Sequence, residues 1–500
     1  MAAPSGLARK SISTGSLFFF CVGASAPMTV LAGGVVQTYA LTGSVGVPLS
    51  FLVIAGALAF FTVGYVAMAR YVPHAATFYA LLARGIGRTW GLVGGTVALV
   101  AYNCIQISLY GLLGFTVSTF FNNTGPWWLW ALVAWAVVGL LGILHINVNA
   151  RVLAVLLVLE IAVILLFDVA AFTHAADGVT VKPLTPNAMF EAGLGSLGGV
   201  FALGVAAFVG YETGPFYGEE ARTQRVVARA SFGALAFIGI LYALSSWAMA
   251  VTVGVGTVGS GADAAPGVVA AARTPGPPIP LGVLDQHYGG AVAKLGNLLL
   301  ITSIVAAMIS FHNSFARYVF GMARERVLPA RLGHIRPGAR GGAPVGGSLL
   351  QSAVALIVIA AFALAGSDPV TTMFTWLSSM AAIGVLLLMF AASLSAIVFF
   401  GRGAGSGESL WQRFWAPLFG MVVLGVVLVI TMLDLYQVLG TSQFAPLTFI
   451  VPGIIVLAVI VGLVWARLLQ SNRPEVYRNI GVGETEPLAV LEHALANLKV

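Results

Sequence analysis

Apolar stretches long enough to cross a membrane recur along the chain from Leu17 to Leu469. A helix needs about 20 mainly apolar residues to span a hydrocarbon core about 30 Å thick. Stretches such as Val152–Leu159 are apolar on every side, whereas the strands of a membrane barrel would alternate apolar and polar residues. The pattern therefore predicts an all-α integral membrane protein. We expect twelve transmembrane helices, near residues 17–40, 47–70, 91–120, 127–147, 151–173, 196–218, 230–254, 289–316, 347–366, 370–400, 414–434 and 446–469.

Composition agrees with this class, since 59% of the residues are hydrophobic and 8% are charged. Ordinary globular proteins are about 25% charged. The net charge is +7, but the basic residues are spread over short loops, which argues against a nucleic-acid partner. Cys21 and Cys104 lie in apolar stretches and predict neither a disulfide nor a metal site. We find no zinc-ligand spacing, phosphate loop or nucleophile elbow in the sequence, and predict no catalytic residue, no cofactor and no enzyme activity.

The placement of the basic residues predicts the orientation of the chain. Twelve spans put both termini on one side of the membrane. If that side is inside, only Lys182, Arg273 and Lys294 of the 24 Lys and Arg residues fall outside. Basic residues gather on cytoplasmic loops. We therefore expect a multi-pass protein of the cytoplasmic membrane with both termini cytoplasmic.

Two polar segments stand outside the predicted spans. The longest external connection, Gly254–Gly289, is rich in Gly, Ala and Pro, and we expect an irregular cap over the outer vestibule or a flexible linker. The tail after Ser471 is short, and residues Pro487–Leu498 have the pattern of an amphipathic helix.

The first and sixth predicted spans contain small residues just before a proline, in Cys21–Met28 and Phe208–Pro215. Proline disrupts a helix interior but suits the first turn of a new helix. Pro27 and Pro215 are therefore expected to open second half-helices. Interruptions at corresponding places in two halves of a chain are typical of a transporter substrate site. The alternative is that these glycines only permit close helix packing.

The spacing of the interruptions suits two five-helix repeats of opposite orientation followed by two further helices, with spans one and six discontinuous. The expected organisation is an N-terminal cytoplasmic segment at 1–16, a first repeat at 17–173, a second repeat at 196–400, helices eleven and twelve at 414–469, and a cytoplasmic tail at 470–500.

Two carboxylates within the spans are candidates for ion coupling, because an ionisable group costs roughly 2.5–3.5 kcal/mol at a helix centre. Glu212 lies inside the sixth-span interruption, where it either serves a cavity or is satisfied by free backbone amides of the break. Glu160 lies in the middle of the fifth span, where it either binds a proton or cation or makes a buried structural hydrogen bond.

Other polar residues of the spans have weaker functional interpretations. Tyr102 and Asn103 in the third span are expected to line the cavity, although interhelical hydrogen bonds explain them equally. Asp168 lies nearer the external end and is expected to be solvated.

Glu219 and Glu220 follow the sixth span close to Arg222 and Arg225. These charges predict an inner gate or a locked loop.

Three stretches together resemble the amino acid, polyamine and organocation permeases, from Ser16 to about Leu469. They are Gly23–Pro27 followed by Gly33 and Gly34, Phe208–Glu212 running on to Gly218–Arg222, and Asn313–Arg317 continuing through Met322–Arg326 to Leu328 and Pro329. The resemblance implies an inverted-repeat fold and a substrate held by backbone groups of the two breaks, with its carboxylate at the first. The implied substrate-binding positions are Gly23, Ala24, Ser25 and Ala26 in the first break and Phe208, Val209, Gly210 and Tyr211 in the sixth, with Glu212 beside them.

Two features depart from the family pattern. The first break lacks the Gly-Ser/Thr-Gly form and Pro27 lacks an amide donor, so an amine without a carboxylate stays open as the substrate. Glu160 stands where several proton-coupled relatives look to have a lysine in place of a sodium ion. A carboxylate does not mimic that cation, and the coupling ion stays open between proton and sodium.

The sequence thus predicts a secondary active transporter, a permease for an amino acid or related amine, working by alternating access with a coupled proton. The alternatives are a sodium-coupled or uncoupled carrier of a polyamine or organic cation, a channel, and a nutrient receptor. A channel would need a continuous polar pore, and few of the predicted spans carry a polar stripe.

Overall fold

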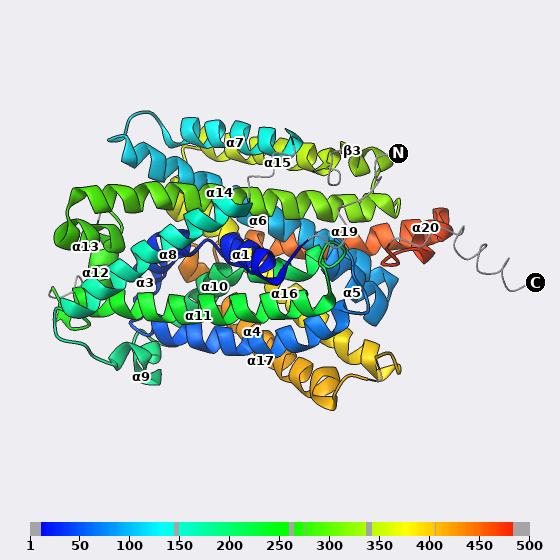
Figure 1. Cartoon of the computed structure of the whole chain (residues 1–500), viewed down its shortest axis with the longest axis horizontal. Coiled ribbons are helices and arrows are strands. Elements are labelled where there is room, and N and C mark those ends of the chain that lie inside the picture. Colours follow the sequence, from blue (N-terminus) through cyan, green and yellow to red (C-terminus); the bar gives the residue numbers. More distant parts are fainter. Residues whose placement is uncertain are drawn as a thin grey trace, which may run out of the picture.

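The computed structural model describes residues 12–144, 150–259, 265–274, 276–336, 343–405 and 407–483. This part of the chain is mostly helical, and its long helices run side by side in one bundle (Figure 1). The strands of the described residues form two small antiparallel ladders. They pair β1 (Thr257–Val258) with β2 (Ala265–Pro266), and β3 (Ile335–Arg336) with β4 (Ala343–Pro344).

Eleven helical stretches of the described residues are long and apolar enough to cross a membrane. A further apolar helix, α7 (Trp127–Leu144), coincides with the predicted fourth span, but its apolar stretch of Trp127–Ile143 is shorter than the others. The eleven stretches are Thr14–Thr42 (α1 to α3), Val47–Ala69 (α4), Arg88–Phe120 (α6), Ala154–Thr173 (in α8, Ala150–Thr173), Ser196–Tyr217 (α10 and η3), Gln224–Val253 (α11), Gly290–Arg324 (α14), Val345–Leu364 (α15), Pro369–Gly401 (η6, Pro369–Phe374, and α16, Thr375–Gly401), Trp411–Leu433 (η7, Trp411–Trp415, and α17, Ala416–Leu433) and Pro446–Asn472 (α19).

Shorter helices connect these stretches. They are α5 (Thr77–Gly85), η2 (Lys182–Leu184), α9 (Pro186–Phe190), α12 (Gly267–Arg273), α13 (Ile279–Tyr288), η5 (Ala330–Gly333), α18 (Leu435–Val438) and α20 (Pro474–Arg478). Helices α12 and α13 lie in the connection predicted to be irregular or flexible, so that prediction is wrong for these residues. Val268 and Leu284 are fully buried, and this burial holds both helices against the bundle. The helix predicted at Pro487–Leu498 lies outside the described residues.

Helix α6 lies inside the bundle, and small residues allow close contact around it. A side chain on Gly91 would collide with Ala83 of α5, and one on Gly462 of α19 would collide with Val93 of α6. Small residues at helix crossings are usual in membrane bundles, where close backbone packing replaces the hydrophobic driving force. Figure 1 shows α7 and α15 together on one flank, and α4 with α17 on the opposite flank.

Both ends of the described chain lie at the same end of the bundle. Ile12 forms backbone hydrogen bonds with Glu220 (3.2 Å) and Arg222 (3.1 Å), and the amide of Gly483 donates to Glu325 at 2.8 Å. We call this end the termini side. Helices α9, α12 and α13 lie at the opposite end (Figure 1).

The first span is broken at a single residue. Helix α1 (Thr14–Ser25) stops at Ala26, whose φ of 46° is left-handed, and Pro27 begins α2 (Pro27–Thr29). The chain continues through a π-helical turn, η1 (Val30–Val35), into α3 (Val36–Thr42). Pro27 therefore opens the second half of this span, as predicted.

The sixth span breaks earlier than its proline suggests. Helix α10 (Ser196–Phe208) ends at Val209, Gly210 has a φ of 120°, and the 3-10 helix η3 (Tyr211–Tyr217) follows. Pro215 lies inside η3, so its predicted place at the start of the second segment is wrong. Only glycine adopts the φ of residue 210 without strain, and the break forms there.

Candidate functional site

The two breaks meet in direct backbone contact. A side chain carbon added to Gly210 would lie 2.8 Å from the carbonyl carbon of Ala24 and 3.0 Å from its oxygen. Glycine is required here twice, because of this contact and because of its positive φ. The crossing brings the carboxyl end of α1 and the carboxyl end of α10 to one place in the bundle.

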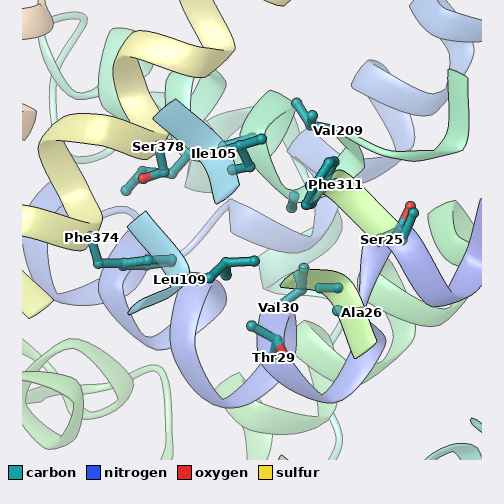
Figure 2. A pocket seen from close by; sticks show the side chains of 16 residues that line it. Ser25, Ala26, Thr29, Val30, Ile105, Leu109, Val209, Phe311, Phe374 and Ser378 are labelled. Atoms are coloured by element: carbon teal, nitrogen blue, oxygen red, sulfur yellow. The ribbon is translucent and has the colours of Figure 1, made fainter. Parts of the chain in front are cut away.

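A cavity lies beside this crossing, with an empty volume of about 500 Å³, open solvent included. Figure 2 shows Phe374 and Leu109 on one side of it and Ser25 and Ala26 on the other. The lining residues are Ala24, Ser25, Ala26, Thr29, Val30, Gly34, Ile105, Leu109, Leu203, Ala206, Ala207, Val209, Ala307, Phe311, Phe374 and Ser378. None of these described lining residues carries an ionisable side chain.

Four of the predicted site residues line this cavity: Ala24, Ser25, Ala26 and Val209. The others surround it without being part of its lining. Gly23 faces a second cavity, and the remaining ones are Tyr102, Asn103, Phe208, Gly210, Tyr211 and Glu212.

The hydrogen-bond donors at the first break are displaced from the predicted positions. The amide of Ala26 already donates to the carbonyls of Val22 (3.1 Å) and Gly23 (3.2 Å). The amides without an intrahelical acceptor are those in the first turn of the next helix. Here they belong to Met28 and Thr29, because Pro27 has none, and the amide of Met28 faces the carboxylate of Glu160. The sequence held this signal, since a proline that opens a helix leaves the two residues after it as the free donors.

Carbonyl groups face the same place from the ends of two helices. Except for the carbonyls that form hydrogen bonds at the breaks, the last carbonyls of α1 and α10 lack intrahelical partners. Ala206, Ala207 and Val209, at the end of α10, line the cavity. One of these last carbonyls is already used, because Tyr242 donates to the carbonyl of Ser25 at 2.9 Å. The ends of these helices carry partial negative charge and favour a cationic group.

Glu212 caps the sixth-span break. Its Oε2 accepts the amide of Gly210 at 2.8 Å and its Oε1 accepts the hydroxyl of Tyr102 at 2.7 Å. The side chain is fully buried, and its backbone carbonyl accepts the hydroxyl of Tyr65 at 3.1 Å. This geometry matches the structural alternative, in which the carboxylate satisfies a free amide of the break.

The other two predicted polar residues make local hydrogen bonds. Asn103 donates through its Nδ2 to the carbonyl of Leu99 at 3.0 Å, within its own helix. The hydroxyl of Tyr211 lies 3.3 Å from that of Thr62 on α4. The first contact lies within α6 and the second joins η3 to α4, and neither Asn103 nor Tyr211 lines the cavity.

An aromatic cluster separates the cavity from the termini side. The rings of Tyr102, Phe216 and Tyr318 contact one another, with centroids 5.5 to 6.2 Å apart. On α6 and α14, Tyr102 and Tyr318 are nearer the termini side than the cavity residues Ile105 and Phe311. The cavity is therefore closed toward the termini side by buried aromatic packing.

Ion pairs lie beyond this cluster. Glu219 pairs with Arg324 and Glu220 with Arg317, each at 3.0 Å, and Arg317 also lies 4.7 Å from the centre of the Tyr217 ring. Both arginine partners lie on α14 rather than in the nearby segment that contains Arg222 and Arg225. The acidic residues bind α14, because the loop after η3 turns toward that helix.

The carboxyl of Glu219 lies beyond the spanning stretch. Burial raises its pKa, but the hydrogen bond and charge of Arg324, with smaller contributions from His74 and the amide of Ala75, outweigh burial and lower the pKa. Glu219 is therefore held in its charged form at the end of the sixth span.

Glu160 faces the second, smaller cavity, between α1, α8 and α14. Its lining includes Gly23, Ser303 and Ser310. The side chain of Glu160 is buried, and its Oε2 has no partner among the described residues; the hydroxyl of Ser303 has none either. A buried carboxylate with one oxygen free of a close partner, beside the hydroxyl of Ser303 and the amide of Met28, is able to bind a proton or a small cation.

Asp168 does not lie in solvent as expected. It is 4% exposed and accepts the hydroxyl of Ser245 at 3.0 Å. Helix α11 covers this part of α8, which no pattern in either helix reveals.

The apolar lining residues from other helices were missed by sequence reasoning. Ile105, Leu109, Phe311 and Phe374 come from three separate spans. Apolar residues in an apolar span look alike in sequence, whether they face lipid, a neighbouring helix or a cavity.

The spanning-length helices define a multi-pass membrane protein, and a cavity at the meeting point of two broken spans is characteristic of a secondary transporter. The chain matches the family model described as amino acid permease over residues 12–460, nearly its whole length. It belongs to this family, within the amino acid, polyamine and organocation superfamily, and is a membrane transporter rather than an enzyme. A search of the curated proteins found no match.

Proposed function

We propose that this permease moves an amino acid or a related amine across the cytoplasmic membrane by alternating access, driven by a coupled proton. The observation that carries the proposal is the cavity at the crossing of Ala24 and Gly210. It lies between helix ends of opposite polarity, which is what a zwitterion requires.

The substrate ammonium group is placed at the free carbonyls that end α1 and α10. The carboxylate is placed at the first-turn amides of α2, above all that of Thr29, which lines the cavity. This arrangement restores a carboxylate site despite Pro27. It moves that site from residues 23–26 to the turn that follows them.

The proposal of alternating access is supported by the closure of the site toward the termini side. The aromatic cluster and the Glu219–Arg324 and Glu220–Arg317 pairs close the termini side. Their separation would open the cavity to that side, which we assign to the cytoplasm because the basic residues gather there. This assignment includes twelve spans, with α7 as the fourth, arranged as two inverted five-helix repeats and two further helices.

Proton coupling is assigned to Glu160 and Glu212. Glu160 has an unpartnered oxygen beside α1, so gain or loss of a proton there changes how α1 packs. Glu212 holds the backbone of the sixth-span break, so protonation would weaken the acceptor that binds Gly210. Sodium is the alternative ion, because Glu160 and two serine hydroxyls are oxygen ligands at the second cavity.

The test is uptake of a labelled amino acid pool into proteoliposomes under a pH gradient or a sodium gradient. We expect the pH gradient to drive uptake, and Glu160→Gln and Glu212→Gln to abolish the drive while counterflow exchange persists. Glu475→Gln is the matched control, because that side chain is 79% exposed in the described chain. Full gradient-driven uptake by both variants would show that these residues take no part in coupling. The transport proposal would be refuted if no amino acid or amine gave saturable uptake.

A further inference from the structure

The residues that line the cavity limit which substrate side chains it accepts. We propose that the substrate is a neutral amino acid with an aliphatic or aromatic side chain. The inference rests on the proposed function and names the substrate class of the same cavity.

The cavity has two ends of different chemistry. Backbone groups of the breaks lie at one end, beside Ser25, Ala26 and Val209. Leu109 and Phe374 lie at the other (Figure 2). An amino acid held by its ammonium and carboxylate groups at the breaks therefore directs its side chain toward apolar walls.

No lining residue offers a partner for a second charge. Glu160 and Glu212 lie outside the lining, and both oxygens of Glu212 are already hydrogen-bonded. A charge moved from water into an apolar site without a partner is strongly disfavoured. Basic and acidic amino acids and polyamines, which carry such a charge, are excluded by this cost.

The side-chain hydroxyls of the lining are mostly used within the protein. Ser25 donates to the carbonyl of Cys21 and Ser378 to that of Thr375, each at 3.2 Å. Thr29 is the lining residue whose buried hydroxyl has no partner among the described residues, and it lies at the break. A polar side chain at the far end would lose its hydrogen bonds to water without replacement.

The experiment is a binding series on the purified full chain, measured by thermal shift and by equilibrium dialysis. Alanine, 2-aminobutyrate, norvaline and norleucine add one methylene at a time. Burial of each methylene is expected to tighten binding about fourfold. Leucine and phenylalanine should bind, whereas arginine, glutamate and putrescine should not.

Two variants test whether the substrate side chain lies in this cavity. Leu109→Trp fills the apolar end of the cavity and is expected to weaken norleucine binding about tenfold or more while alanine binding changes little. Leu349→Trp is its control, because Leu349 is 52% exposed on α15. Phe374→Ala removes an apolar wall and should flatten the methylene series, and Phe449→Ala, at a position 60% exposed on α19, should not.

The outcomes separate this inference from the proposed function. Tighter binding of arginine, glutamate or putrescine than of norleucine, or a flat methylene series in the unmodified chain, overturns the apolar class. Transport of that charged solute into proteoliposomes would leave the proposed function standing. Binding and transport of none of these solutes would overturn both.

Discussion

The backbone of Gly210 in the sixth span packs against the backbone of Ala24 in the first. A side-chain carbon added to Gly210 would lie only 2.8 Å from the carbonyl carbon of Ala24. This contact fixes the two breaks relative to each other. The cavity lies beside this contact, so the shape of the cavity depends on how the two breaks cross.

Gly210→Ala is expected to lower thermal stability and abolish transport. The left-handed conformation alone costs about 1–3 kcal/mol for a side-chain-bearing residue, and the added methyl group collides with Ala24. The measurements are the melting temperature and uptake. Gly56→Ala is the control, because that helical glycine on α4 has open space around it. Normal uptake by Gly210→Ala would contradict the close crossing of the breaks.

Tyr102→Phe is expected to destabilise the folded protein by roughly 1–3 kcal/mol, because Oε1 of buried Glu212 loses its donor. The effect should be non-additive with Glu212→Gln, since both changes act on one hydrogen bond. A double-mutant cycle on melting temperature checks this. Tyr288→Phe, at a residue 40% exposed, should have little effect. Strict additivity would mean that the two side chains act separately.

Glu219→Gln is expected to ease opening of the termini side, because the charge that pairs with Arg324 is lost. Hydrogen bonds to charged groups contribute roughly 1.5–3 kcal/mol. Labelling of a cysteine introduced at Ser314, a buried residue of α14 between Phe311 and Tyr318, reports the opening in a chain whose two native cysteines are replaced. Labelling should rise in the variant, with Glu475→Gln as the exposed control, and unchanged labelling would argue against a gate.

Acid should have the same effect as Glu219→Gln. The pKa of Glu219 in the folded protein is lowered relative to the unfolded value of about 4.3. The stabilisation is therefore fully present above the unfolded pKa and is lost as pH falls through the lower folded pKa. Because only the thiolate reacts, the labelling rate at position 314 is compared with that of Glu219→Gln at the same pH. The rate in the unmodified gate should be lower near neutral pH and should approach that of the variant only below about pH 4.3. A rise centred near neutral pH would assign the effect to another group.

Gly481→Val is expected to release the segment after α20 from the bundle. The amides of Gly481 and Gly483 donate to the carboxylate of Glu325, and a side chain on Gly481 would lie 2.6 Å from Ala83. Limited proteolysis after residue 472 measures the release. Gly440→Val is the matched control, with a similar positive φ and nothing within 4 Å. Equal protection of the two variants would contradict the docked segment.

The sequence predicted the spans well because hydrophobicity over about 20 residues is a local property that the bilayer imposes. The eleven spanning stretches overlap the predicted ones, and Pro27 opens a half-helix where its ring geometry suggested. The prediction that Pro215 begins the second segment of the sixth span was wrong, because a glycine with positive φ and the capping carboxylate of Glu212 place the break earlier. Two helices, α12 and α13, form in the connection predicted to be irregular, since tertiary burial overrides the Gly and Pro content of those residues.

By itself the sequence determined the membrane class, the order of the helices and the presence of two interruptions, because each follows from residues near one another in the chain. Only the tertiary structure decided that Ala24 and Gly210 touch, that Glu219 pairs with Arg324, and that Asp168 is buried. It also selected the apolar side chains that line the cavity. These relationships join residues on different helices, and in an apolar bundle the packing of backbones, rather than the hydrophobicity of any one span, sets which faces meet.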